Sequence, residues 1–233
     1  QYQLSKVMFP IGDLDKKEVR LIAKQQNLIT AEKKDSQGLC FVGKVKLPEF
    51  LQQKLKVKKG KVILISKNNE IFNSVSDPDD FSVQNLKLMS NPYNYSIDKG
   101  SVIGNHGGAH FFTIGQRKGL AIGGTKEPLF VIGTDVVNNL VYVGEGKNHP
   151  GLYRKVLFVL EKNFHRLRED YDYTDSKLFD TRIRYRQPLQ KSQLVFTENG
   201  TFFIFDKPQS SITKGQFVVW YNGDELIGSG VID

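Results

Sequence analysis

The stretch QLVFTENGTFFIF, from Gln193 to Phe205, decides the fold class of this chain. Two apolar runs of strand length lie on either side of the dipeptide Asn199-Gly200. Both residues of that dipeptide tolerate a positive φ, which makes it a favoured connection in a two-stranded hairpin. The stretch therefore predicts two antiparallel strands, at 193–197 and 201–205.

Similar hairpin and turn patterns continue on both sides of this stretch. Asn222-Gly223 is a second hairpin dipeptide, and it separates two further expected strands at 217–221 and 225–227. Toward the N-terminus, strands are expected at 129–134, 140–144, 156–161 and 179–187. Closely spaced short strands with such turns are typical of a small antiparallel barrel.

The N-terminal segment instead shows the pattern of a capped helix. Asp15 can serve as the N-cap, and Glu18, three residues later, completes a capping box. The helix is expected to run over about 16–26, and Asn27 fits its end. An apolar stripe recurs at helical spacing and should be buried, and it consists of Val19, Ile22 and Ala23.

The segment between helix and barrel changes character along its length. Residues 61–66 have the composition of a strand, and the turn Asn68-Asn69 leads into a second expected strand at 70–72. Residues 73–100 are rich in Asn, Ser, Asp and Pro and lack a clear period. We therefore interpret them as a surface insertion.

These patterns divide the chain into three parts. We expect a short helical part at 1–44, a small β-rich central domain at 45–126, and a C-terminal antiparallel β-barrel at 127–233. The fold class is therefore expected to be mixed but mainly β. No repeat of fixed period is present, which disfavours a solenoid or a propeller.

The composition limits the partners of the chain. Thirty-three Lys and Arg against 25 Asp and Glu give a net charge of +8, which favours polyanionic partners such as nucleic acid. Part of this excess lies in a lysine run at 54–61, where charge can simply maintain solubility. No stretch approaches the roughly 20 apolar residues of a membrane span, so no membrane association is expected. With one cysteine and four histidines, an internal disulfide is excluded and a metal site is not expected.

Cys40 is the single cysteine, and a lone cysteine is more often an inert buried residue than a reactive one. Against that, Lys33 and Lys34 precede it in a polar segment, and nearby cations favour the thiolate. Gly38 also gives the backbone freedom to present the thiol. The nearest histidine along the chain is His106, so a protease-like Cys–His pair is unsupported.

A glycine-rich stretch at 104–124 is the most unusual part of the sequence, because seven of its 21 residues are Gly. It can be interpreted as tight turns that link two β regions. It can equally be a loop in which Gln116, Arg117 and Lys118 reach a nucleic-acid backbone or a base. A nucleotide-binding fingerprint is not supported, because the strand–loop–helix context is absent.

The expected strand 179–187 is basic on one side. Strict alternation places Asp180, Arg182, Arg184 and Arg186 on one face and Phe179, Thr181, Ile183 and Tyr185 on the other. An ordinary solvated face is the simple interpretation. Three guanidinium groups along one strand face nevertheless favour contact with phosphates.

Short motifs follow one another along nearly the whole chain. The two most specific are TIGQRKGL at 113–120 and DSQGLCF at 35–41, and the others are FPIG at 9–12, RYRQ at 184–187, KGQ at 214–216 and YNG at 221–223. In this order they resemble the tRNA-specific 2-thiouridylases. Two departures are a segment 73–100 longer than bacterial members carry, and Lys214 where many members have Pro.

The resemblance implies an enzyme of three parts, namely an ATP-pyrophosphatase domain, a small central domain and a barrel that helps to bind tRNA. The phosphate loop S-G-G-x-D-S of the first part does not occur in this sequence. We therefore expect 1–44 to be a remnant of the catalytic domain, with the site for ATP and Mg²⁺ upstream of this chain. The isolated chain is expected to be inactive.

In that family, ATP adenylates the uridine and a persulfide on the second of two cysteines supplies the sulfur. Cys40 matches that second cysteine, and a sulfur-donor protein acting upstream is expected to load it. The first cysteine, which would form a disulfide bond with it during turnover, has no counterpart here and is expected upstream.

The resemblance also assigns tRNA contacts to Arg184, Tyr185 and Gln216. Together with the residue patterns, it gives the expected tRNA-binding set Gln116, Arg117, Lys118, Arg182, Arg184, Tyr185, Arg186 and Gln216. The Asn- and Lys-rich composition and the segment 73–100 suggest a eukaryotic member, for which a mitochondrial location is expected.

The sequence thus predicts part of a tRNA sulfurtransferase that 2-thiolates the wobble uridine. The alternative is a stand-alone RNA-binding β-barrel module in which Cys40 is incidental. The capped helix and the cysteine segment before the barrel favour the enzyme, because a pure binding module needs neither.

Overall fold

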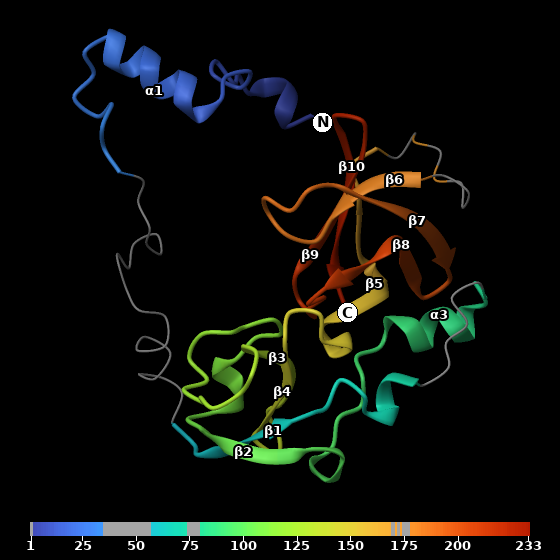
Figure 1. The fold of residues 1–233 in the computed structure, drawn as a ribbon. Coiled ribbons are helices and arrows are strands. Elements are labelled where there is room, and N and C mark those ends of the chain that lie inside the picture. The colour runs from blue at the N-terminus through green and yellow to red at the C-terminus, as the bar shows by residue number, and fades with distance from the viewer. Residues whose placement is uncertain (1, 35–56, 74–79, 169–170, 172, 174–177) are drawn as a thin grey trace. The chain divides into compact units, whose positions relative to one another are not determined.

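The computed structural model describes residues 2–34, 57–73, 80–168, 171, 173 and 178–233 (Figure 1). The chain divides into two compact units, Gln1–Leu55 and Lys56–Asp233. The proposed nucleophile Cys40 lies outside the described residues, as does the part 74–79 of the expected insertion.

The first unit contains the expected helix, α1, at Lys16–Gln25, preceded by a short 3-10 helix η1 at Leu4–Lys6. The capping box is confirmed, since a side-chain oxygen of Asp15 accepts hydrogen bonds from the backbone N–H groups of Lys17 at 2.7 Å and Glu18 at 2.9 Å. Asn27, with a φ of 52°, stands just beyond the helix end. These contacts are local, which is why the sequence alone predicts them.

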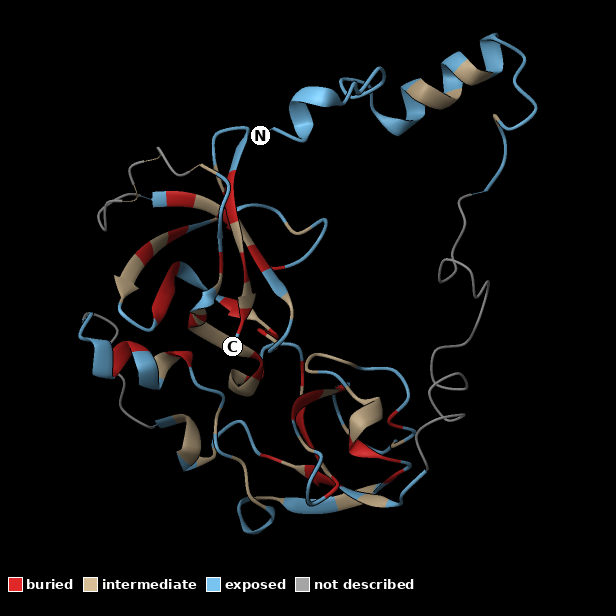
Figure 2. Cartoon of the chain, turned by 180° about the vertical axis from the view of Figure 1, so that it is seen from behind, coloured by how far each residue is buried: buried red, intermediate tan, exposed pale blue. Residues whose placement is uncertain are grey.

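The expectation that an apolar stripe of α1 is buried is wrong for the described structure. Among the described residues, no side chain of α1 is buried, and Ile22 is 43% exposed. Figure 2 accordingly shows the helix in pale blue and tan without red. An apolar stripe is buried only where another surface covers it.

A four-stranded mixed sheet forms the first part of the second unit (Figure 1). Its strands are β1 at Gly60–Leu64, β2 at Ser101–His106, β3 at Leu129–Asp135 and β4 at Leu140–Glu145, in the order β2-β1-β4-β3. β1 and β4 are parallel, while the other neighbours are antiparallel. Both faces are covered, with Val62 and Val141 in one apolar cluster and Ile63 and Tyr142 in another.

The second part is a closed barrel, and its strands pair in the order β10-β5-β8-β7-β6-β9. The strands are β5 at Tyr153–Arg166, β6 at Leu178–Arg182, β7 at Gln190–Thr197, β8 at Gly200–Ser210, β9 at Phe217–Asn222 and β10 at Glu225–Ile232. All neighbours are antiparallel, around a core that includes Phe179, Phe203 and Trp220. The mainly β fold class with an antiparallel barrel is confirmed, as are the hairpins at Asn199-Gly200 and Asn222-Gly223.

The barrel begins at Tyr153 and not at residue 127 as expected. β3 and β4 were expected in the barrel, but they pair with each other, and β4 also pairs with β1 of the sheet. The strands themselves lie where the sequence predicts them. The long-range pairing of β1 with β4 decides that β3 and β4 belong to the sheet and not to the barrel. No local sequence pattern predicts that pairing.

The short strand expected at 70–72 is also wrong, because this segment forms a 3-10 helix η2 at Glu70–Asn73. The side-chain oxygen of Asn69 accepts from the N–H of Ile71 at 3.1 Å, and its main-chain oxygen accepts from Phe72 at 3.1 Å. The turn predicted at Asn68-Asn69 therefore continues into the helix and does not open a strand.

The interpretation of 73–100 as a surface insertion does not hold for its second half. Helix α3 at Val83–Ser90 is followed by a 3-10 helix η3 at Ile97–Lys99. Leu86 of α3 is fully buried in a cluster with Val156 and Phe202 of the barrel. A helix of eight residues is too short to show a clear apolar period, so the sequence pattern conceals it.

Candidate nucleic-acid interface

Strand β6 ends at Arg182, so the expected strand 179–187 is too long. The chain turns here because Thr181 already pairs with Gln190 of β7 across the hairpin. Residues 184–186 therefore lie in the connecting turn. The expectation of three arginines along one strand face is wrong.

The alternation of buried and exposed side chains fails at the same point. Ile183 stays in the barrel core, as expected, whereas Tyr185, expected on the same face, is 87% exposed. The turn is held by a hydrogen bond of 3.0 Å from the N–H of Ile183 to the side-chain oxygen of Gln187. Arg186 has a φ of 69°, in the left-handed region that a strand residue does not adopt. Tyr185 and the two arginines beside it are thus presented to solvent.

A concavity of about 570 Å³ lies beside this turn, where β6 and β9 pair. Its lining includes Arg182, Arg184, Tyr185, Gln216, Phe217 and Tyr221, and we call it the β6–β9 concavity. Four of the eight residues expected to bind tRNA thus lie together, although 34 positions separate Arg182 from Gln216. Arg186 does not line it.

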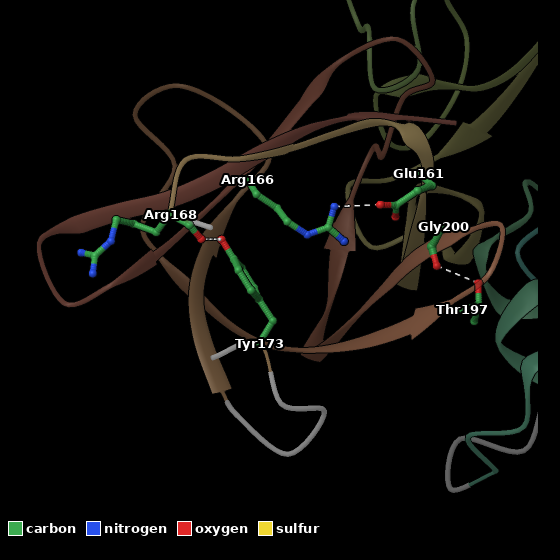
Figure 3. Close-up of polar contacts among 6 residues, drawn as sticks. All are labelled: Glu161, Arg166, Arg168, Tyr173, Thr197 and Gly200. Carbon is green, nitrogen blue, oxygen red and sulfur yellow. Dashed lines mark hydrogen bonds and ion pairs between the residues drawn. The ribbon is translucent and has the colours of Figure 1, made fainter. Parts of the chain in front are cut away.

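No described carboxylate forms an ion pair with the arginines of the β6–β9 concavity. Neither Arg182 nor Arg184 forms an ion pair with an acidic side chain among the described residues, and the neighbouring Asp180 is paired with Lys191 at 2.9 Å. Elsewhere on the barrel, Arg166 is paired with Glu161 at 2.7 Å (Figure 3). Cations without a counter-ion in a concave surface attract polyanions.

Two polar groups of the β6–β9 concavity also lack a hydrogen-bond partner among the residues that the structure describes. Nε of Arg182 and Oε1 of Gln216 are buried and make no hydrogen bond within the described part of the chain. The guanidinium of Arg182 lies over the ring of Tyr221, 5.4 Å from its centroid. A buried donor or acceptor that stays unpaired costs about 1–3 kcal/mol, so each group would gain a partner if its side chain turned toward a ligand in the concavity.

The glycine-rich loop reaches the barrel at the edge of this site. Gly115 has a φ of 83°, and a Cβ placed on it would lie 2.3 Å from Oγ of Ser211 and 4.0 Å from Nη2 of Arg184. Two backbone hydrogen bonds fasten the loop to β3, one from Gly115 to Val131 at 2.7 Å and one from Val131 to Gln116 at 3.0 Å. Glycine is required here both for its backbone conformation and for the close approach.

The three loop residues expected to bind tRNA differ in their surroundings. The side-chain oxygen of Gln116 accepts from the N–H of Thr113 at 3.1 Å, and its amide nitrogen donates to the main-chain oxygen of Lys118 at 2.8 Å. Its amide therefore holds the loop in shape. Arg117 and Lys118 are exposed, so these two of the three loop residues are open to solvent.

A larger cavity of about 920 Å³ lies between the sheet and the barrel. Its lining includes Tyr95 and Arg154, and Nη2 of Arg154 donates to the main-chain oxygen of Ile212 at 2.8 Å while Nη1 donates to that of Ser90. Burial lowers the pKa of Arg154 and raises that of Tyr95. Arg154 therefore links α3, β5 and the segment after β8, a role that its sequence position does not indicate.

Phe217 and Tyr221 are site residues that the sequence analysis missed. Both lie on β9, where Val218 and Trp220 point into the core. Period-two alternation on the expected strand 217–221 places Phe217 and Tyr221 on the outer face. That pattern could have identified them as exposed aromatic residues.

No group of three metal-ligating side chains gathers anywhere in the part of the chain that the structure describes. Within the same residues, no helix is long and apolar enough to cross a membrane.

Three family models match separate segments of the chain. Residues 1–44 match a tRNA methyl transferase HUP domain, residues 91–145 a tRNA methyl transferase PRC-barrel domain, and residues 154–232 an aminomethyltransferase beta-barrel domain. The second of these matches covers strands β2, β3 and β4 of the sheet, and the third covers the barrel.

Curated relatives match the whole chain. It is 55% identical over 234 residues to the tRNA-specific 2-thiouridylase MnmA of Christiangramia forsetii, with 100% of this chain and 59% of that protein covered. The protein of the same name from Flavobacterium johnsoniae gives the same values, and that of Halalkalibacterium halodurans is 40% identical over 100% of this chain and 53% of its own length. The chain spans little more than half the length of these relatives. Over that span, it belongs to the family of the tRNA-specific 2-thiouridylases.

Proposed function

We propose that this chain is the tRNA-binding part of an enzyme that 2-thiolates the wobble uridine of tRNA. The β6–β9 concavity carries the proposal, because it combines exposed aromatic rings with two arginines and two polar atoms that have no counter-ion or hydrogen-bond partner among the described residues. Nucleic-acid sites have this combination, in which cations neutralise phosphates and aromatic rings stack on bases. The names of the relatives supply the reaction and the substrate class.

Binding would extend from the barrel onto the glycine-rich loop. Arg117 and Lys118 are exposed on the loop that meets the barrel beside Arg184. Cations on both sides of this contact would bind phosphates along one RNA backbone. Gln116 would act by shaping the loop, and Arg186, outside the concavity, would contribute charge only.

The sulfur chemistry would use Cys40 as a persulfide carrier, loaded by a sulfur-donor protein. This rests on the match of DSQGLCF to the family motif and on the match of 1–44 to a HUP domain. That second match supports an enzyme over a stand-alone RNA-binding barrel. A disulfide with another cysteine would require a residue outside this chain, because Cys40 is its single cysteine.

ATP with Mg²⁺ is the cofactor that the family resemblance implies, and the described residues do not fit it. Within the glycine-rich stretch, Gly107 and Gly108 precede η4 at Ala109–Phe111, which is a single 3-10 turn and not the longer helix whose N-terminus holds a triphosphate. No cluster of carboxylates among the described residues would hold Mg²⁺. Adenylation of the uridine would therefore depend on residues beyond the described ranges.

The test uses two preparations. The 233-residue chain should bind unmodified tRNA with an affinity that falls steeply as salt increases, because each phosphate contact releases counterions. The complete protein should restore 2-thiouridine, measured by mass spectrometry of digested tRNA, in cells that lack their own enzyme. A chain that binds no tRNA at low salt, or a complete protein that restores no 2-thiouridine, would contradict the proposal.

A further inference from the structure

The geometry points to a more specific role for the β6–β9 concavity: we propose that it holds one unstacked nucleobase of the RNA, whose edge is read by Arg182 and Gln216. This inference rests on the proposed function, since it specifies what the tRNA presents to the barrel. The simpler expectation, which the arginines alone support, is contact with phosphates only.

The aromatic side chains are the first observation. Tyr185 is 87% exposed and Phe217 is 58% exposed, and both line the same concavity. Neither ring contributes to the barrel core, where Phe179 and Trp220 are buried. Phosphate gains little from an aromatic face, whereas an unstacked base stacks on one.

The unpaired polar atoms are the second observation. Phosphate oxygens only accept hydrogen bonds, so a phosphate can satisfy Nε of Arg182 but cannot satisfy Oε1 of Gln216. No hydrogen bond joins either end of the Gln216 amide to another described residue. The edge of a nucleobase carries donors and acceptors side by side, and a glutamine amide can bind both.

Arg182 is held at its guanidinium and Gln216 at its backbone. The guanidinium of Arg182 lies over the ring of Tyr221, and the backbone of Gln216 accepts from Ile232 at 2.9 Å and donates to Thr213 at 3.3 Å. A donor and an acceptor placed side by side in this way discriminate between bases, because the wrong base leaves one of them unpaired. Arg184, which lines the same concavity but is exposed, would contact the phosphate.

This division of roles predicts two kinds of variant. Tyr185→Ala and Phe217→Ala should each weaken tRNA binding by about five- to 150-fold without changing the slope of log affinity against log salt. Arg184→Ala should lower that slope by somewhat under one unit, because it removes a phosphate contact. Phe217→Tyr keeps a ring and should retain most of the affinity.

The experiment is a salt titration of tRNA binding by the 233-residue chain and these variants, with thermal unfolding to confirm that each is folded. Phe81→Ala is the matched control, because Phe81 is 49% exposed on a different segment and should have no effect. A second measurement compares short homopolymers of A, C, G and U. The wild type should bind some of the four homopolymers more tightly than others, and Gln216→Leu should reduce that difference in affinity.

The outcomes separate this inference from the proposed function. If the wild type binds no tRNA, the proposed function itself is wrong. If the wild type binds but both alanine variants stay within about twofold, or if they change the salt slope as Arg184→Ala does, the base pocket is wrong and the concavity contacts phosphates only. Equal affinities for the four homopolymers would likewise contradict reading of a base.

Discussion

Nη2 of Arg184 donates a hydrogen bond of 2.7 Å to the main-chain oxygen of Ser211, 27 positions further along the chain. The N–H of Ser211 in turn donates to the main-chain oxygen of Leu152 at 2.6 Å, and its side chain lies against Gly115. The β6–β7 turn, the segment after β8 and the glycine-rich loop therefore meet at one point. The position of Arg184 depends on residues from both the sheet and the barrel parts.

Gly115→Ala tests this junction. The substitution should lower the free energy of unfolding by more than the ~1–2 kcal/mol that a left-handed backbone costs an L-residue, because its Cβ would also press on Ser211. tRNA binding should weaken with it, since Ser211 fixes Arg184. Gly124→Ala is the matched control, because Gly124 has a φ of 86° and nothing within 4 Å. If urea unfolding gave the same loss of stability for Gly115→Ala and Gly124→Ala, the contact with Ser211 would be unimportant.

His149 predicts a pH dependence of stability. It is buried, its Nδ1 accepts from the N–H of Gly151 at 3.2 Å, and its Nε2 therefore donates to the main-chain oxygen of Ile65 at 3.1 Å. Burial lowers the pKa of this neutral imidazole below the value of about 6.5 expected in the unfolded chain. The unfolded state thus binds more protons in acid, and the stability present at neutral pH is lost as the pH falls through about 6.5 toward the folded pKa.

Urea unfolding between about pH 7.5 and pH 5.5 measures this effect. His149→Gln should flatten the profile in part, because buried His106, whose pKa is also lowered by burial, contributes as well. A wild-type stability that does not fall across this range would exclude the effect.

Cys40→Ser should abolish thiolation by the complete protein and leave its affinity for tRNA nearly unchanged. The thiol would take part in the chemistry and not in positioning the RNA, so the loss should fall on turnover. Mass spectrometry of digested tRNA and a binding titration measure the two properties separately. Sulfur incorporation by the variant would remove Cys40 from the mechanism.

The 233-residue chain by itself should neither bind ATP measurably nor thiolate tRNA, because the sequence lacks the family's phosphate loop. Calorimetric titration with ATP and Mg²⁺ is the direct test. Micromolar binding would mean that the nucleotide site lies within this chain.

Local patterns predicted the features that depend on a few neighbouring residues. The hairpins at Asn199-Gly200 and Asn222-Gly223 and the capping box of Asp15 and Glu18 are confirmed. In each case the contacts that fix the structure lie within a few positions of one another. The closely spaced strands were sufficient to predict an antiparallel barrel, which closes as β9 pairs with β10 and with β6.

Features that depend on distant partners were missed. The alternation from Phe179 to Arg186 is continuous in the sequence, but strand β6 ends where its pairing with β7 requires a turn. The assignment of β3 and β4 to the sheet depends on β1, and the burial of Leu86 depends on β5 and β8. The candidate site was found in part, because four expected residues meet in the concavity while Phe217 and Tyr221 were overlooked.

The mitochondrial location stays a prediction. The named relatives come from bacteria, and a composition rich in Asn and Lys does not distinguish a bacterial from a mitochondrial protein.

The most direct test of the central claim is a salt titration of tRNA binding for the wild type, Arg184→Ala, Arg184→Lys and Arg166→Ala. Arg184→Ala should weaken tRNA binding by about 1–3 kcal/mol and lower the slope of log affinity against log salt by somewhat under one unit. Arg184→Lys should recover only part of the lost affinity, because lysine lacks the bidentate geometry of the guanidinium. Arg166→Ala removes the same charge from a residue already paired with Glu161, so it should have a much smaller effect. If Arg184→Ala is folded and matches either the wild type or Arg166→Ala in affinity and slope, the β6–β9 concavity is not where the chain binds tRNA.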